Sequence, residues 1–238
     1  MNHPARDPLA EIDWIGRNGF DFVDFTLEPP AADPQQIEVN AVRRALDGHN
    51  LGVVAHTAYY LPLASPFASI RQTCLEEFRR ALEAAHRIGA TVMNVHFDKP
   101  PKFFSDQQTV EWHVEVLAPL CNEAAKLGMT IVLEHTPCAG RNQLEIIHKC
   151  LEEAPLLRFH LDSGHAKLER DYDRFDEYVD GMGAKLMHVH LSDNDGTTDQ
   201  HLPLGAFPLS PSCRWSAETR RSAWHNRQPI VPGGSAGL

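Results

Sequence analysis

Short apolar runs alternate with longer helical patterns along most of the chain, and this alternation constrains the fold more than any other feature. The apolar runs cover residues 21–28, 51–57, 91–97, 129–135, 157–162 and 185–191. The helical patterns cover about 8–18, 34–48, 68–88, 106–127, 142–153 and 171–181. Such repetition predicts parallel strands joined by right-handed crossovers. Because the runs are apolar on both sides, we expect strands that are buried on both faces.

The carboxyl end of every predicted strand carries a histidine or a carboxylate. These residues are Glu28, His56, His96, Glu134, Asp162 and His190. In a parallel α/β barrel the carboxyl ends of the strands converge on one face, and active sites lie there. The sequence therefore predicts an α/β fold, a TIM (β/α)8-like barrel, with a polar cluster at its mouth.

The predicted barrel is incomplete, because strands one and eight have no counterpart in the pattern. These two strands would be neighbours in a closed barrel, so a single seam is missing. Residues 206–238 contain four Arg, one Glu and no Lys, and they show neither helical nor strand periodicity. We interpret residues 1–205 as an incomplete barrel domain and 206–238 as an irregular tail. Two hypotheses stay open: a natural disordered tail, or a misplaced start combined with a frameshift near the end.

Composition narrows the class of protein. A chain of 238 residues with 42% apolar residues suits one globular domain. The net charge of −10 argues against a protein that coats nucleic acid. No apolar run approaches the roughly 18 residues of a membrane span, and the N-terminus lacks a secretory signal. The five cysteines have no metal-binding or redox spacing, so we expect free thiols and a cytoplasmic protein.

Glu134 is the carboxylate most strongly indicated as functional. It ends the apolar run in IVLEHTP, and an unpaired carboxylate is costly to bury at such a position. We expect it to bind a metal or to act as a general base.

His56 and His96 end two neighbouring predicted strands. Each is either a packing histidine or a ligand for metal or substrate, and their shared position favours the ligand. Tyr59 and Tyr60 follow His56, and they either pack on the surface or form a wall against a substrate ring. Glu28 is a candidate for contacting the substrate.

Two short motifs add further candidate ligands. In LDSGHA, Asp162 and His165 are three residues apart, and Gly164 permits the turn between them. In DQHLPLG, Asp199 and His201 are spaced so that both can chelate one ion. The two motifs are therefore expected to meet at the barrel mouth.

The HVH motif places His188 and His190 on one face of a strand, with His190 nearer the mouth. We assign His190 as a metal ligand, and His188 and His160 as a deeper layer that bonds internally or to a buried water. Mixed histidine and carboxylate ligands without thiolates suit Zn²⁺, Mn²⁺, Co²⁺ or Fe²⁺, and Mg²⁺ is a further candidate.

Four motifs resemble those of the xylose isomerase-like TIM barrel superfamily, which contains sugar phosphate isomerases/epimerases and the endonuclease IV group (AP endonuclease family 2). The motifs are HTAYYLPLASP, LEHT, LDSGHA and HVHLSDNDGTTDQHLPLG. The endonuclease resemblance implies zinc ligands at His56, His96, Glu134, Asp162, His165, His190, Asp199 and His201.

The epimerase resemblance implies one divalent ion at Glu134, Asp162 and His190, completed by a glutamate that ends strand eight. There Glu134 would belong to an acid/base pair, and the second member has no match in this chain. The segment LDSGHAKL looks more like the isomerase branch than the endonucleases, and EHTPCAGRN departs from the endonuclease pattern.

We therefore expect a metal-dependent isomerase or epimerase that acts on a sugar or small hydroxy-ketone through an enediolate, with its full activity in an intact parent. One alternative is a zinc-dependent apurinic/apyrimidinic endonuclease, for which DNA would be the partner. Another is an inactive barrel fragment, whose two open strand edges would favour a homodimer. No membrane partner is expected.

Overall fold

Six parallel strands form one curled sheet in the computed structural model, which describes residues 2–137, 142–168 and 174–206. Neighbours in the sheet follow chain order from β1 to β6. The strands are β1 (Phe22–Leu27), β2 (Gly52–Thr57), β3 (Val92–His96), β4 (Thr130–Glu134), β5 (Arg158–Asp162) and β6 (Leu186–His190). The α/β, TIM-barrel-like prediction is confirmed in the form of a half-barrel.

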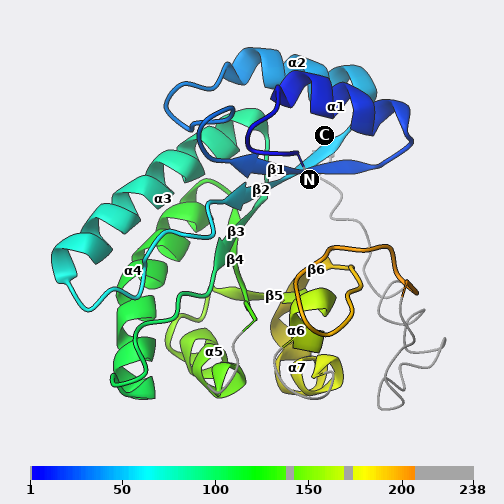
Figure 1. Ribbon diagram of the computed structural model, residues 1–238. Coiled ribbons are helices and arrows are strands. Elements are labelled where there is room, and N and C mark those ends of the chain that lie inside the picture. Colours follow the sequence, from blue (N-terminus) through cyan, green and yellow to red (C-terminus); the bar gives the residue numbers. More distant parts are fainter. Residues whose placement is uncertain (1, 138–141, 169–173, 207–238) are drawn as a thin grey trace, which may run out of the picture.

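The helices lie on the convex side of this sheet (Figure 1), with α1 and α2 beside β1 and with α5, α6 and α7 beside β5 and β6. They are α1 (Pro8–Arg17), α2 (Val39–His49), α3 (Ala68–Ile88), α4 (Asp106–Lys126), α5 (Gln143–Glu153), α6 (Ser163–Leu168) and α7 (Phe175–Met182), followed by the 3₁₀ turn η1 (Gly183–Lys185). The concave side is left for the carboxyl-end side chains.

Local sequence explains where the helices begin and end. Ser105 and Gln108 form a reciprocal capping box at the start of α4. Gly89 ends α3 with a φ of 95°, a left-handed conformation that favours glycine. The predicted start of α2 near residue 34 is wrong, because the Asp33 side chain accepts a hydrogen bond from the backbone N–H of Gln35 and forms a turn instead.

One continuous hydrophobic core lies between the helices and the sheet. Phe25, Phe78, Leu117, Ile131 and Phe159 are among its largest members, and none is more than 1% exposed. Burying apolar side chains on the helix-facing side of each strand turns the alternate side chains toward the concave side. This alternation positions the candidate site.

The two ends of the sheet are β1 and β6, and each has one hydrogen-bonded neighbour among the described strands. The tail predicted over 206–238 lies outside the described residues except for Ala206, and its frameshift hypothesis stays a prediction, as does the homodimer. None of the helices in the described ranges is both long and apolar enough to cross a membrane.

Candidate metal centre

Glu134 lies at the centre of a buried group of histidines on the concave side of the sheet. Its side chain is 1% exposed, and its Oε2 atom lies 3.1 Å from His96 Nε2 and 3.9 Å from His56 Nε2. Burial raises the pKa of this carboxyl, but the imidazoles around it, His160 and His96 foremost, hold the pKa well below its usual range. Glu134 is therefore ionised at neutral pH.

His56 and His96 face each other beside this carboxylate. Their Nε2 atoms are 3.0 Å apart, and burial lowers the pKa of His96. One ring nitrogen from each histidine and one oxygen of Glu134 lie within 4.8 Å of one another. A neutral imidazole offers a lone pair on one ring nitrogen. Two facing Nε2 atoms that both carried a hydrogen would repel each other, so this group is better suited to binding a cation between them.

A second group lies where β5 passes into α6. The backbone N–H of His165 donates to Asp162 Oδ1 at 2.9 Å, and this bond fixes the turn of the LDSGHA motif. His165 Nδ1 lies 2.8 Å from the His135 carbonyl and 3.7 Å from Glu134 Oε1. Glu134, Asp162 and His165 form the second set of donors within 4.8 Å.

Asp199 and His201 extend this group toward the rim. Asp199 Oδ2 lies 3.1 Å from both His165 Nε2 and His201 Nε2. Burial lowers the pKa of His165, but the Asp199 hydrogen bond and the nearby carboxylates outweigh it and raise that pKa to about 9. The carboxyl pKa of Asp199 falls below its usual range because of the same two histidines.

His190 joins the two groups. Its Nδ1 lies 3.3 Å from Glu134 Oε1 and 3.4 Å from Asp162 Oδ2. Burial opposes its positive charge, but three carboxylates, Asp162 first, raise its pKa to about 12. Without a cation, a proton on His190 offsets part of the negative charge of these carboxylates.

Unpartnered buried atoms test whether these residues fit a metal. Among the described residues, His56 Nδ1, His96 Nδ1 and Asp162 Oδ2 are buried without a hydrogen-bond partner. Buried polar groups normally have partners. The orphaned atoms and the mixed nitrogen and oxygen donors both fit a divalent cation.

The predicted deeper layer lies under Glu134. His160 Nδ1 lies 2.9 Å from Asn94 Oδ1 and 3.4 Å from Glu134 Oε2, while Asn94 Nδ2 also donates to Glu134. The rings of His160 and His188 are in edge contact, with centroids 4.6 Å apart. The expected internal bonding therefore runs through Asn94 rather than directly between the two histidines.

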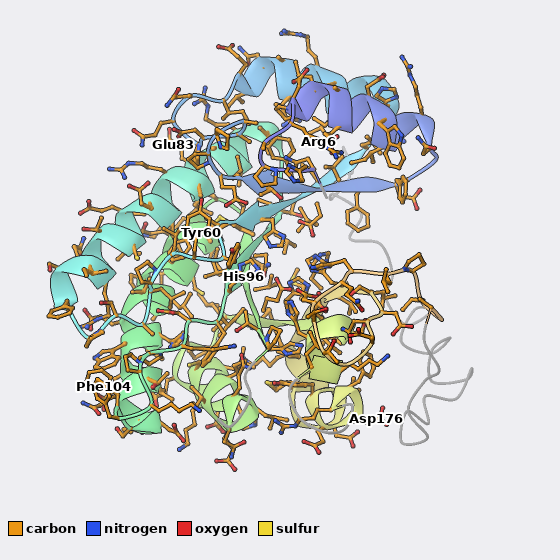
Figure 2. All side chains as sticks on the ribbon, in the orientation of Figure 1. Arg6, Tyr60, Glu83, His96, Phe104 and Asp176 are labelled. Carbon is orange, nitrogen blue, oxygen red and sulfur yellow. The ribbon has the colours of Figure 1, made fainter. Side chains whose placement is uncertain are left out.

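A cavity of about 410 Å³ opens above Glu134. Glu28 and Tyr59 line its wall, and Tyr59 is 70% exposed. In Figure 2, His96 lies inside the curve of the sheet with Tyr60 nearby, whereas Glu83 and Asp176 lie on the outer helices. The pKa of Tyr60 is raised by burial and by Glu28.

Asp24 is the main site residue that the sequence analysis missed. It is 7% exposed and contacts His190 at 2.5 Å and His56 at 3.5 Å. A signal was present, because Asp24 and Thr26 alternate along one face of β1, and Glu28 continues the alternation just after the strand. The structure thus brings the predicted ligands together around Glu134 and adds one carboxylate from an edge strand.

The fold and this cluster define a class: parallel α/β half-barrels with histidine and carboxylate donors at the carboxyl ends of the strands. The chain belongs to the xylose isomerase-like TIM barrel family, whose model matches residues 12–206.

Individual relatives support this assignment. An uncharacterized protein of Methanocaldococcus jannaschii is 27% identical over 169 residues, which cover 67% of this chain and 57% of that protein. A crystal structure of a D-tagatose 3-epimerase-like protein is similar with a TM-score of 0.75, 22% identity and coverage of 86% of this chain and 79% of its own. The structure of an AP endonuclease, family 2, from Brucella melitensis is similar with a TM-score of 0.60 and 20% identity. The similarity covers 77% of this chain and 73% of that one.

Proposed function

We propose that this chain carries the site of a metal-dependent isomerase or epimerase that acts on a small sugar or hydroxy-ketone. The observation that carries the proposal is Glu134: an ionised, 1% exposed carboxylate that lines a cavity of about 410 Å³ and is surrounded by metal-type donors. The similarity to a D-tagatose 3-epimerase-like protein supports a sugar as the substrate class.

Glu134, Asp162 and His190 would hold the cation, with His96 and His165 beside them. When bound, a divalent cation polarises a carbonyl and the adjacent hydroxyl, which makes the proton on the intervening carbon more acidic.

Glu134 acts as the base in this proposal. It accepts the proton from the α-carbon to give a substrate enediolate, and in an isomerisation it returns the proton to the adjacent carbon. An epimerisation needs a second acid on the opposite face of the enediolate. Asn94 and His160 contact the Glu134 carboxylate from below and fix its orientation toward the cavity. A positioned base of this kind contributes about 10²–10⁴-fold to the rate.

Glu28 and Tyr59 bind and orient the substrate from the cavity wall. A carboxylate accepts hydrogen bonds from sugar hydroxyls, and an aromatic face packs against the carbon–hydrogen side of a sugar ring. These contacts would set which carbon lies next to Glu134.

The test is exchange of the α-proton of a ketose with D₂O, followed by NMR in the presence of Mn²⁺, Co²⁺ or Zn²⁺. We expect exchange with metal, and a loss of about 10²-fold or more in Glu134→Gln. Glu83→Gln, on the exposed face of α3, is the matched control and keeps the wild-type rate. Absence of exchange with every metal and ketose, together with binding of the dye ANS, supports the inactive-fragment alternative.

One observation favours a second candidate, a metal-dependent nuclease that acts at abasic sites in DNA. His165, Asp199 and His201 form an additional donor group at the cavity rim, and several clustered ions suit phosphodiester hydrolysis. Chelator-sensitive incision of a duplex that contains one abasic site would support this candidate, and His201→Gln would then reduce incision.

A further inference from the structure

A second set of donors lies in the deeper layer, beneath the Glu134 cluster and next to the open side of the sheet. One ring nitrogen from each of His160, His188 and His190 lies within 4.8 Å of the others. Asp24 Oδ2 lies 2.5 Å from His190 Nε2 and 3.6 Å from His188 Nε2. We refer to Asp24, His160, His188 and His190 as the inner cluster.

Three atoms of the inner cluster are buried without a partner in the structure. These are His160 Nε2, His188 Nε2 and Asp24 Oδ1. Because Asn94 Oδ1 can only accept, His160 Nδ1 must donate to it, and Nε2 keeps its lone pair. The inner cluster therefore contains buried polar atoms without a partner, which is costly unless a cation takes them up.

We propose that the inner cluster is a second metal site and that Zn²⁺ is its ligand. Three imidazole nitrogens and one carboxylate oxygen form a donor set that suits Zn²⁺ in four-coordinate geometry. Calcium and magnesium prefer oxygen donors and would bind poorly. The site differs from the proposed catalytic one, since Asp24 and His188 have no role there and His160 only orients Glu134.

His190 is the residue that both sites share. Its Nε2 faces Asp24, and its Nδ1 faces Glu134 and Asp162. A neutral imidazole binds one ion at a time. When the inner ion takes His190, the outer group keeps Glu134, Asp162 and His165, whose donor atoms lie within 4.8 Å of one another.

The inner ion would act as a structural cross-link. Asp24 belongs to β1, and His188 and His190 belong to β6, the two ends of the sheet. A cation that binds the folded chain and not the unfolded chain stabilises the fold, and here it also ties the two open edges together. A cavity of about 460 Å³ lies along this seam and is lined by Asp24, His188 and His190.

The test loads the whole chain with Zn²⁺, removes free metal by gel filtration, and counts bound ions by plasma mass spectrometry. His188→Gln and, as a second variant, Asp24→Asn are each expected to bind one ion fewer than the wild type. Both should lose the part of the Zn²⁺-dependent rise in melting temperature that the inner ion contributes. His86→Gln, on the exposed face of α3, is the control. It should keep the wild-type ion count and the wild-type rise in melting temperature.

Glu134→Gln separates this site from the proposed function. It should lose α-proton exchange but keep the inner ion, whose X-ray absorption should show histidine ligands with Zn–N distances of about 2.0–2.1 Å. Equal ion counts and equal melting shifts in the wild type, His188→Gln and Asp24→Asn would overturn the inner site. Loss of exchange in Glu134→Gln would still support the catalytic proposal in that case.

Discussion

Asp24 Oδ2 lies 2.5 Å from His190 Nε2, although the two residues occupy the opposite edge strands β1 and β6. The six parallel strands form a curled sheet (Figure 1). Side chains from its two edges come within hydrogen-bond distance of each other. This contact closes the site on the side where the strand ladder is open.

Replacing Asp24 by Ala should destabilise the metal-free protein. Asp24 is 7% exposed and forms a buried ion pair with His190, so its removal takes one of three carboxylates away from a buried positive charge. We expect the free energy of unfolding in urea to fall by about 3–5 kcal/mol. Asp21→Ala, at an exposed position just before β1, should change it by less than about 0.5 kcal/mol. Equal effects of the two substitutions would show that the contact between the edges contributes nothing.

Gly164→Ala should weaken metal binding at the outer site. A Cβ atom at this position would collide with Ser192 Oγ and lie 3.2 Å from Asp162 Oδ1, so Ser192 must move and Asp162 must give by a few tenths of an ångström. We expect a loss of about 10–100-fold in Zn²⁺ affinity, measured by competition with a chromophoric chelator. Gly48→Ala is the control, because a Cβ there meets nothing within 4 Å. Unchanged affinity in Gly164→Ala would remove Asp162 from the ligand set.

The metal-free protein should lose stability as the solution becomes alkaline. The pKa of His165 is raised to about 9 in the folded state. The contribution of His165 to the stability of the fold is therefore fully present below the unfolded-state pKa of about 6.5, and it is lost as the pH rises through about 9. The free energy of unfolding should fall by on the order of 3 kcal/mol. Urea unfolding at several pH values measures this loss. His165→Asn should flatten this slope, and a variant with the wild-type slope would contradict the assignment.

His113 should make the fold sensitive to acid. It is fully buried, and burial lowers its pKa to about 4. The pKa of His113 is lower in the folded state than in the unfolded state. The stability that depends on a neutral His113 is therefore fully present above about pH 6.5 and is lost as the pH falls toward 4. His113→Gln should reduce the acid-induced loss by about 3 kcal/mol. His148→Gln, at an exposed position on α5, should leave the acid profile unchanged.

The strands and most helix ends could be predicted from the sequence because their causes are local. Apolar runs mark the strands, and residues such as Ser105 and Gly89 mark helix ends. Most of the donor cluster was predictable for a related reason: parallel strands bring their carboxyl ends together, whatever the details of the loops.

The rest depends on tertiary geometry. Asp24 lies inside a strand, where a carboxylate gives no indication of a partner 166 residues away. The curvature that brings β1 to β6 follows from the packing of the whole sheet rather than from any one motif. At Asp33, a side-chain hydrogen bond competes with the helix, and a periodic pattern does not show which one forms.

The central claim is that Glu134 organises a metal centre at the carboxyl ends of the strands. The most direct measurement is the number of divalent ions bound per chain in the wild type and in Glu134→Gln, by plasma mass spectrometry after loading and gel filtration. The account predicts tightly bound metal in the wild type and the loss of one ion in Glu134→Gln. A wild-type chain that retains no metal, or a variant that binds as many ions as the wild type, would contradict it.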